Sequence, residues 1–306
     1  MIIHILVVAS FKNGRYAPFI TEQAEALRRV CGCRVDLFGV TGKGLAGYLK
    51  ALPALERAIR STGADIVHAH YGLCGLLASL QHLVPVVATY HGSDLNVRGV
   101  RALSKLSVAR CSFNIFVSPG LVRIARPHGR WSLLPCGVDL CDGQLMPRDE
   151  ARRLLGLDLQ GRYVLFAGAF CNAVKNVELA QSAVALLPGV ELLELKGYDR
   201  DGVTRLMCAA DALLMTSHTE GSPQVVKEAM ACGCPVVSVD VGDVRHLLDG
   251  VGGCHIAERN AADIAEKLGL VFSRDARTDG RTRVEKLELD NDSVARALME
   301  IYRSVL

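Results

Sequence analysis

The chain has 306 residues, of which 50% are hydrophobic and 22% are charged, and its formal net charge is +3. This length suits two domains, and the composition excludes a disordered chain because apolar residues suffice for large cores. The 11 cysteines are scattered, so we expect reduced thiols in a cytoplasmic protein instead of a disulfide scaffold, and no four residues have zinc-binding spacing.

The opening segment, MIIHILVVA, is too short to span a bilayer and lacks a basic region and a cleavage site, which predicts a buried first strand and no leader. In the first half, runs rich in Val and Ile alternate with amphipathic stretches, a pattern typical of parallel strands joined by helices. We expect strands at 2–9, 34–39, 65–69, 85–90, 113–117 and 132–135, and helices at 17–30, 46–61, 72–81, 100–110 and 119–126.

Residues 136–147 break this pattern with Gly, Asp and Pro and are interpreted as a linker. After a helix at 148–155, the alternation resumes and residues 274–290 stay ambiguous. We expect strands at 163–168, 190–195, 212–216, 235–239 and 254–257, and helices at 175–187, 200–209, 222–232, 243–249, 260–272 and 291–305. The sequence thus predicts two doubly wound α/β domains, at 1–142 and 143–290, each with a crevice at the carboxyl ends of its strands.

Charge is distributed unevenly. Residues 1–142 contain 16 Lys and Arg against 8 Asp and Glu, which gives +8, whereas residues 143–306 carry −5. A basic half attracts anionic partners such as phospholipid headgroups, a lipid-linked pyrophosphate or nucleic acid, although ordinary solvated helix faces explain it equally well. Nucleic acid is not expected as a partner, because no run of basic residues is interleaved with aromatics.

Gly42, Gly44 and Gly47 match the dinucleotide-binding pattern G-x-G-x-x-G. In that motif the glycines belong to the first strand–helix turn, and an acidic residue ends the second strand. Here the pattern follows the second predicted strand, and Asp65 begins the third. A flexible loop before a helix is therefore the preferred interpretation, and a nicotinamide site is the weaker one.

The most informative segment is TSHTEGSPQVVKEAM at 216–230, which follows a predicted strand. Pro223 suits the first turn of a helix, whose free N–H groups would form an anion site fit for a pyrophosphate. Glu220 and Glu228 flank this turn, and carboxylates accept hydrogen bonds from paired sugar hydroxyls. The competing interpretation is that one Glu complements the helix dipole and the other pairs with Lys227.

This segment, with the following AMACGCPVV, resembles the donor-site signature of the family 4 retaining glycosyltransferases of the bacterial surface-polysaccharide type. The same order of segments appears at 91–94 (HGSD), 134–139 (LPCGVD), 209–211 (AAD) and 240–243 (DVGD). The resemblance implies the GT-B fold, in which two Rossmann-like domains face each other across a cleft, and a C-terminal helix, here 291–306, that returns to the N-terminal domain.

The resemblance also implies roles for individual residues. Glu228 is expected to bind the ribose of the donor nucleotide, and Glu220 the donor sugar. Lys175 is expected to neutralise the diphosphate, and His91 to reach the sugar and phosphates. The remaining donor-binding candidates are Gly14, Asn176, Gly221, Ser222 and Pro223. The family generally needs no metal, so no cofactor is expected.

His68 and His70 alternate on a predicted strand and therefore share one face. They lack partners for a metal site, so we expect them to line the acceptor side or to pack in the core. Tyr71, Asp94 and Asn96 are further acceptor-side candidates.

The sequence departs from the family in two places. The family commonly has an Arg after the Gly that begins the Lys-bearing loop, but here Gly168 is followed by Ala169 and Phe170. The family also has a further βα unit after the strand at 190–195, whereas only a few residues separate this strand from the helix at 200–209. The pocket for the nucleobase is therefore expected to be shortened.

The predicted function is retaining transfer of a hexosyl or N-acetylhexosaminyl group from a nucleotide diphosphate sugar to a hydroxyl of a glycan or lipid-linked acceptor. The predicted location is cytoplasmic, peripheral at the inner face of the membrane. The alternatives are a sugar-nucleotide epimerase or hydrolase on the same fold, a non-catalytic sugar-nucleotide-binding subunit, and a nicotinamide oxidoreductase.

Overall fold

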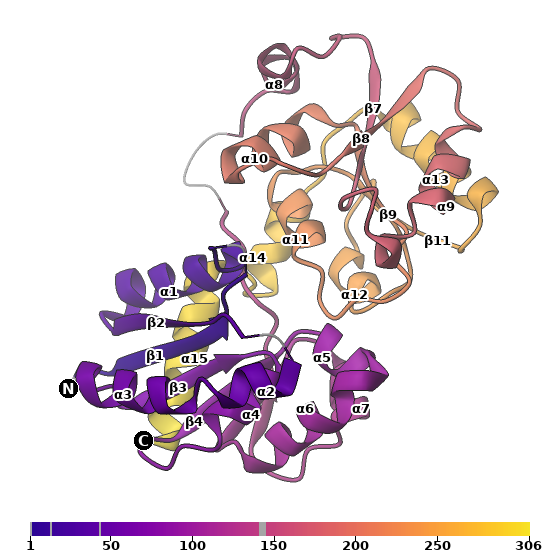
Figure 1. The fold of residues 1–306 in the computed structure, drawn as a ribbon. Helices are drawn as coiled ribbons and strands as arrows, with labels where there is room; N and C mark the ends of the chain where they lie inside the picture. The colour runs from indigo at the N-terminus through magenta and orange to yellow at the C-terminus, as the bar shows by residue number, and fades with distance from the viewer. Residues whose placement is uncertain (1, 13, 43, 141–144) are drawn as a thin grey trace. The chain divides into compact units, whose positions relative to one another are not determined.

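A computed structural model describes residues 2–12, 14–42, 44–140 and 145–306 (Figure 1). The contacts between Cα atoms divide the chain into an N-terminal unit, Met1–Gly137 with Asn291–Leu306, and a C-terminal unit, Val138–Asp290. Each unit contains one parallel β-sheet that is covered by helices, so both are Rossmann-like α/β units as predicted. Within the described ranges, no helix combines the length and the apolarity that crossing a bilayer requires.

The sheet of the N-terminal unit has the strand order β2-β1-β3-β4-β5-β6, and all its strand pairs are parallel. Its strands are Val- and Ile-rich, and β1, β3, β4 and β5 are almost wholly buried, as expected for a sheet with helices on both faces. The bounds are β1 (His4–Ser10), β2 (Arg34–Val40), β3 (Ile66–His70), β4 (Val86–Tyr90), β5 (Phe113–Phe116) and β6 (Trp131–Leu133).

Alternate side chains of β1 enter the cores on opposite faces of this sheet. Ile5 and Val7 pack with helices α1 and α15, whereas Leu6 and Val8 pack with α3 and α4. The helices are α1 (Pro18–Cys31), α2 (Gly44–Leu49), α3 (Leu52–Thr62), α4 (Gly72–Ala78), α5 (Ser93–Asn96), α6 (Arg98–Arg110), α7 (Pro119–Ala125) and α15 (Asn291–Val305).

The sheet of the C-terminal unit has the order β11-β10-β9-β7-β8, again with parallel pairs throughout. Its strands are β7 (Arg162–Phe166), β8 (Val190–Glu194), β9 (Ala212–Met215), β10 (Val236–Val239) and β11 (His255–Ala257). The helices are α8 (Arg148–Leu155), the 3-10 turn η1 (Ala173–Lys175), α9 (Val177–Val184), α10 (Arg200–Ala209), α11 (Gln224–Ala231), α12 (Val244–Leu248), α13 (Ala261–Arg274) and α14 (Gly280–Lys286).

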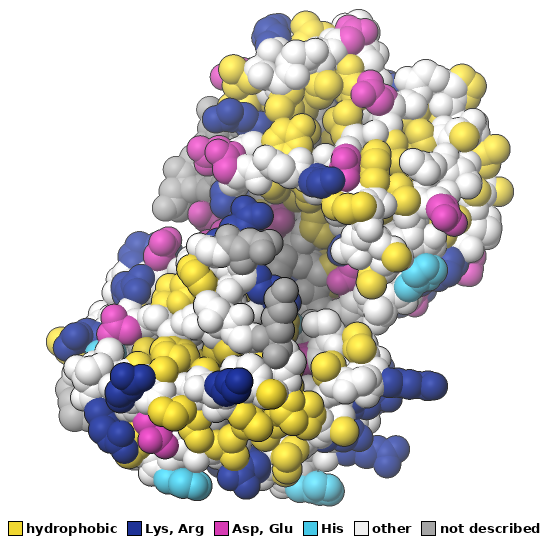
Figure 2. All heavy atoms as spheres, in the orientation of Figure 1, with side chains coloured by type: hydrophobic (Ala, Val, Ile, Leu, Met, Phe, Trp, Pro, Cys, Tyr) yellow, Lys and Arg dark blue, Asp and Glu magenta, His cyan; other side chains and the backbone are white. Residues whose placement is uncertain are grey.

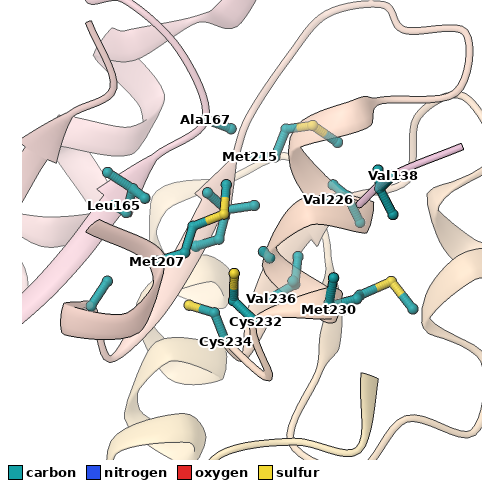
Figure 3. Packing of buried hydrophobic residues seen from close by; sticks show 14 of the residues in the cluster. Val138, Leu165, Ala167, Met207, Met215, Val226, Met230, Cys232, Cys234 and Val236 are labelled. Carbon is teal, nitrogen blue, oxygen red and sulfur yellow. The ribbon is translucent and has the colours of Figure 1, made fainter. Parts of the chain in front are cut away.

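One core of this unit lies between the sheet and helices α10, α11, α12 and α14. In Figure 3, Leu165, Met207, Met215, Val226 and Val236 point into this core from strands and helices far apart in the sequence. The other core lies on the opposite face, where Val164 and Phe166 pack with α9 and α13.

In both sheets the first strand lies between the second and the third, so the order of strands reverses direction beside it. In the N-terminal unit, β1 pairs with both β2 and β3, and in the C-terminal unit β7 pairs with both β8 and β9. Ligands of doubly wound proteins bind outside the carboxyl ends of the strands at such a switch point. The loops after β1 and β3, and those after β7 and β9, are therefore the places to look for a site.

The division between the units falls at Gly137 and Val138, five residues before the predicted boundary after residue 142. Val138 is fully buried in the core of the C-terminal unit, and its N–H donates to the carbonyl of Leu289 at 2.9 Å. The predicted N-terminal domain extends beyond this division, because the Gly and Asp residues next to Val138 indicated a linker and not a buried position. Residues 141–144 of that linker lie outside the described residues.

Helix α15 belongs to the N-terminal unit, although it follows the whole C-terminal unit in the sequence. It packs along α1 beside the sheet (Figure 1), with Val294, Leu298 and Tyr302 buried. The Tyr302 hydroxyl hydrogen-bonds to Nδ1 of His68 on β3 at 2.6 Å, which ties the last helix to the centre of the first sheet.

Candidate functional site

Two loops meet at the switch point of the C-terminal unit, one after β7 and one after β9. The backbone N–H of His218 donates to the carbonyl of Val174 at 2.9 Å. The Thr216 hydroxyl donates to the carbonyls of Lys175 and Asn176, both at 2.9 Å. Asn176 has a left-handed backbone, φ 54°, which Asn tolerates better than most residues. The two loops are thus joined into one structure.

The joined loops bring Lys175 and Glu220 into an ion pair. Lys175 Nζ donates to Oε1 of Glu220 at 2.7 Å, and the two side chains are only 19% and 17% exposed. A partly buried pair of this kind interacts more strongly than a surface pair, because less water screens it. The two residues that the sequence singled out from separate segments therefore form one charged centre.

Glu228, on the second turn of α11, forms another ion pair. Arg200, the first residue of α10, donates from Nη1 to Oε1 of Glu228 at 2.7 Å. Asp199 caps α10 by accepting from the N–H of Gly202 at 2.8 Å, and this cap fixes the backbone position of Arg200 at the start of the helix. Sequence reasoning missed Arg200. Its position directly after the shortened loop was the one available signal.

The turn before α11 is closely packed. The N–cap of α11 is Pro223, and Gly221 is buried. A Cβ at Gly242, in the loop after β10, would lie 2.5 Å from the carbonyl oxygen of Gly221, so only glycine fits there. This contact places the DVGD segment against the turn that connects Glu220 to α11.

Several buried polar atoms near this turn are unsatisfied among the described residues. Ser217 Oγ, Ser222 Oγ and Asp243 Oδ1 are shielded from solvent and have no hydrogen-bond partner. Burial raises the pKa of the Asp243 carboxyl group. The nearby Ser222 hydroxyl opposes this rise, although the two groups are not in hydrogen-bonding geometry. Unsatisfied buried polar groups are uncommon in native proteins and often mark a ligand site.

The structure explains both departures from the family. Phe170, the second residue after Gly168, has its ring 5.6 Å from that of Phe166 and packs into the core under α9 and α13. Its N–H donates to Oε1 of Glu194 at 2.7 Å. This position therefore holds no cation. Only residues 195–199 separate β8 from α10, with no strand between them, so this part of the unit is shortened as expected.

In the N-terminal unit, the candidate histidines form a chain. Nδ1 of His70 lies 3.0 Å from Nε2 of His91, and the two rings stack at 5.2 Å. His68 contacts the Thr89 hydroxyl through Nε2 at 2.8 Å. Burial lowers the pKa of His70 to about 3 and that of His68 well below its usual value. Both rings are therefore neutral at neutral pH.

Of the remaining acceptor-side candidates, Tyr71 and Asp94 contact His91, and Asn96 lies in the helix that follows it. Tyr71 has φ 74°, rare for a residue with a side chain, and its ring lies 4.5 Å from that of His91. Asp94 is buried, and its carboxylate accepts from the N–H groups of His91 and Gly92 at 3.1 and 2.8 Å. Asp94 thus shapes the loop that carries His91. Asn96 ends α5, and its carbonyl accepts from Arg101 at 3.0 Å.

Gly14 lies in the loop after β1, in a tight turn closed by Lys12 and Arg15, with φ 75°. Of the three glycines of the G-x-G-x-x-G string, Gly42 lies in the loop after β2, and Gly44 and Gly47 lie in α2. A Cβ at Gly42 would lie 2.3 Å from the carbonyl oxygen of Gly47. Gly42 and Gly44 help to line a cavity of about 380 Å³ at the ends of β1 and β2. The glycines therefore serve close backbone packing where α2 begins, after the second strand, and not in the first turn that a dinucleotide site uses.

Across the part of the chain that the structure describes, no three His, Cys, Asp or Glu side chains are placed to hold a metal ion. The expected donor-site residues lie in the C-terminal unit except Gly14 and His91. The acceptor-side candidates Tyr71, Asp94 and His70 gather around His91 in the N-terminal unit.

Comparison with known protein families yields two matches that together cover most of the chain. Residues 9–141 match the family described as Glycosyltransferase Family 4, and residues 164–273 match the family described as Glycosyl transferases group 1. The first match spans β2 to β6 and the end of β1, and the second spans β8 to β11 with most of β7 and α13.

Two curated relatives are similar in sequence. A Bacillus subtilis protein, TuaC, is named for a role as glycosyltransferase in teichuronic acid biosynthesis, and is 29% identical over 234 residues, 67% of this chain and 60% of that protein. The D-inositol 3-phosphate glycosyltransferase of Mycolicibacterium gilvum is 31% identical over 272 residues, 72% of this chain and 61% of that protein. The matched part thus spans about 60% of these relatives' length.

Solved structures are similar in fold. Sucrose-phosphate synthase from Thermosynechococcus elongatus aligns with a TM-score of 0.83 at 19% identity, covering 99% of this chain and 98% of that one. HepE from Anabaena, solved with UDP-glucose, aligns with a TM-score of 0.78 at 16% identity, covering 98% and 99%. At these identities the likeness concerns the arrangement of helices and strands.

Proposed function

The chain belongs to the family 4 glycosyltransferases of the GT-B fold, and we propose that it moves a sugar, with retention of configuration, from a nucleotide diphosphate sugar to a hydroxyl acceptor. One observation carries this proposal. Two carboxylates, Glu220 and Glu228, lie at the carboxyl edge of the second sheet, and each is paired with a cation at 2.7 Å. Hydroxyl-binding and phosphate-binding groups thus alternate along this edge.

The proposed donor fits both kinds of group. Sugar and ribose hydroxyls donate hydrogen bonds to Glu220 and Glu228. The diphosphate then takes the place of these carboxylates as the partner of Lys175 and Arg200. Lys175 then neutralises the charge that develops on the diphosphate as it leaves, which is the largest contribution expected in the absence of a metal. Arg200 supplies a second cation in place of the Arg that is absent after Gly168.

The bond changes balance without a cofactor. The bond between the anomeric carbon and the diphosphate oxygen breaks, and its electron pair stays on the diphosphate. The acceptor hydroxyl forms the new bond on the same face of the sugar, and its proton passes to the leaving diphosphate. His91, with Tyr71 and His70 around it, is the group of the N-terminal unit proposed to contact the donor sugar.

For the acceptor, we propose a glycan or lipid-linked hydroxyl at the cytoplasmic face of the membrane. Relatives named for teichuronic acid biosynthesis and for D-inositol 3-phosphate support an acceptor rich in hydroxyls. The net charge of +8 in residues 1–142 supports attraction to an anionic surface. In Figure 2, Lys and Arg side chains stand out over the N-terminal unit, whereas acidic and basic side chains mix over the other. The transferred group is proposed to be hexosyl or N-acetylhexosaminyl.

Thermal unfolding in the presence of UDP, GDP, ADP, CMP and NAD tests the donor site. One nucleoside diphosphate should stabilise the protein, by about 2.7 kcal/mol at a hundred times its Kd. Glu228→Gln and Arg200→Ala should remove most of this stabilisation. The matched controls are Glu191→Gln and Arg205→Ala, which change exposed residues of the same unit and should leave it intact.

Measurements of turnover distinguish a glycosyltransferase from the alternative functions. With the stabilising nucleotide's sugar conjugates, Lys175→Ala should lower kcat about 10²-fold or more, whereas Lys196→Ala on the exposed loop after β8 should not. Binding without transfer to any hydroxylated acceptor would favour a non-catalytic subunit. Donor conversion without an acceptor would favour an epimerase or hydrolase. Stabilisation by NAD alone would refute the transferase.

A further inference from the structure

His91 is held on several sides by residues of the N-terminal unit. Its backbone N–H donates to the carboxylate of Asp94 at 3.1 Å, and its ring lies 4.5 Å from that of Tyr71. His91 is half-buried, whereas His70 and Cys136 beside it are buried. Of these three side chains, His91 is therefore the one that a ligand can reach.

The two ring nitrogens of His91 each face a polar atom. Nε2 lies 3.0 Å from Nδ1 of His70, and Nδ1 lies 3.7 Å from Sγ of Cys136. The second distance suits a hydrogen bond that involves sulfur, which is a larger atom than oxygen or nitrogen. With a partner at each nitrogen and Tyr71 against its ring, the imidazole is fixed both in position and in rotation.

Backbone packing places the Cys136 thiol next to His91, although 45 residues of sequence separate them. Cys136 belongs to an apolar core that includes Tyr90. The next residue is Gly137, where a Cβ would lie 2.7 Å from Oδ1 and 2.8 Å from Cα of Asn291, the first residue of α15. Only glycine fits there, so the close approach to α15 sets the course of the backbone that carries the thiol.

The hydrogen-bonding capacity of the three groups decides where each proton lies. A neutral imidazole has one N–H donor and one acceptor nitrogen, and burial keeps His70 neutral by lowering its pKa to about 3. An imidazole nitrogen accepts hydrogen bonds well, whereas a thiol sulfur is a weak acceptor. For a neutral His91, the favoured order has the Cys136 S–H donating to Nδ1 of His91, and the Nε2–H of His91 donating to Nδ1 of His70. The reverse order would leave the sulfur as the acceptor of an N–H.

We propose that Cys136 is a positioning residue for the transfer reaction. Its thiol holds the His91 ring in the tautomer whose proton lies on Nε2, which is the form that donates a hydrogen bond from that nitrogen. His70 accepts this hydrogen bond in the free protein, and an oxygen of the donor sugar or its phosphates takes the place of His70 in the complex. The role in transfer rests on the proposed function, whereas the tautomer does not.

The first test is the tautomer of His91 in the intact wild-type protein without any ligand. NMR spectroscopy of the isotope-labelled protein distinguishes protonated from unprotonated ring nitrogens by their chemical shifts, and the loss of signals in His91→Gln assigns them. A protonated Nε2 and an unprotonated Nδ1 are expected at neutral pH. A proton on Nδ1 alone, or on both nitrogens, would overturn the proposal, whether or not the protein transfers a sugar.

Variants of Cys136 test its role in the reaction. Cys136→Ala removes the donor to Nδ1 of His91, so kcat should fall about tenfold, the value of one hydrogen bond, with the KM for the donor nearly unchanged. Cys136→Ser replaces the S–H by an O–H and should restore most of kcat. Cys33→Ala, which removes another buried thiol of the same unit, should leave kcat at the wild-type level.

The outcomes for this inference and for the proposed function are distinguishable. A wild-type protein that transfers no sugar would refute the transferase, and the tautomer of His91 would then decide the role of the thiol. Equal kcat values for the wild type and Cys136→Ala would refute the positioning role alone. A fall in kcat that Cys136→Ser does not restore would assign Cys136 to packing and also overturn the proposal. If Cys136→Ala does not fold, the wild-type tautomer and the kcat of Cys136→Ser still decide.

Discussion

Histidine residues in the first sheet are held neutral by their surroundings. His68 and His70 project from one face of β3 and are buried, with ring contacts to Tyr302 and His91. Their common face was predictable, because side chains alternate along a strand. Their partners were not, because Tyr302 lies more than 200 residues away in the sequence and only the packing of α15 brings it close.

This burial makes stability depend on pH. In the unfolded chain a His takes up a proton below about pH 6.5, whereas the folded protein resists protonation until far lower pH, about 3 for His70. Stability is therefore complete above pH 6.5 and should fall by about 1.4 kcal/mol per pH unit for each buried His as the pH drops below it. Urea unfolding between about pH 7 and pH 5 measures this slope.

The comparison of variants isolates the effect. His70→Asn should reduce the slope by one proton, and His128→Asn, at an exposed position, should leave it unchanged. Burial raises the pKa of Asp94 and so contributes a slope of opposite sign, but it cancels when variant and wild type are subtracted. An equal slope in all three proteins would contradict the assignment of His70 as a neutral buried group.

Among the elements, the loops at the carboxyl edge of the second sheet support one another. Gly242, with φ 64°, lies against the carbonyl of Gly221, and Arg259 donates to the carbonyls of Thr216 and Ser217 at 3.2 and 2.9 Å. The turn that carries Glu220 is therefore held from two sides. Its geometry is set by backbone contacts from neighbouring loops, not by its own sequence alone.

Gly242→Ala should disturb this support. The new Cβ would meet Gly221 at 2.5 Å and the backbone would be strained, whereas Gly250→Ala, at φ 75° with no atom within 4 Å, introduces the strain alone. Gly250→Ala should cost about 1–2 kcal/mol of unfolding free energy, and Gly242→Ala should cost more, because its Cβ also meets the carbonyl oxygen of Gly221. Only Gly242→Ala should weaken nucleotide binding, by tenfold or more in a calorimetric titration. Equal affinities in the two variants would show that the contact does not position the donor loop.

Every predicted strand is present, because most are short runs rich in apolar residues and bounded by polar turns. The errors lie in short helices. The predicted helix at 46–61 is two helices, α2 and α3, because Pro53 at the start of α3 cannot continue a preceding helix. Helix α5 has four residues and α14 has seven, too few to show a helical period.

The site was partly predictable. Glu220 and Glu228 stand out because the signature that contains them is long and ordered. Arg200 does not stand out, because its pairing with Glu228 depends on how α10 packs beside α11, across 28 residues of sequence.

The whole molecule combines two similar units with different charge. The N-terminal unit, residues 1–137 and 291–306, contains 18 Lys and Arg against 8 Asp and Glu, which gives +10, whereas residues 138–290 carry −7. An anionic surface should therefore attract one unit and not the other. The exposed basic residues of α6, α7 and the residue that follows α7 include Lys105, Arg123 and Arg126.

Co-sedimentation with vesicles tests this attraction. The protein should bind vesicles with anionic lipid and not neutral ones, and added salt should release it. Changing Lys105, Arg123 and Arg126 together to Gln should weaken binding roughly a hundredfold, at about 1 kcal/mol for each charge. The same change at three exposed basic residues of the other unit, Arg153, Arg205 and Lys286, should have little effect. Equal losses would refute a membrane-facing N-terminal unit.

Because α15 packs in the first unit, that unit cannot complete its fold until the whole chain has been synthesised on the ribosome. The core between β1, α1 and α15 includes Val294, Leu298 and Tyr302, which are synthesised after the whole C-terminal unit. Residues 138–290 can therefore reach their native structure first. Until α15 is made, α1 alone covers this part of the sheet, so apolar side chains of the core stay exposed. For that interval the N-terminal half depends on chaperones or on its own slow collapse to avoid aggregation.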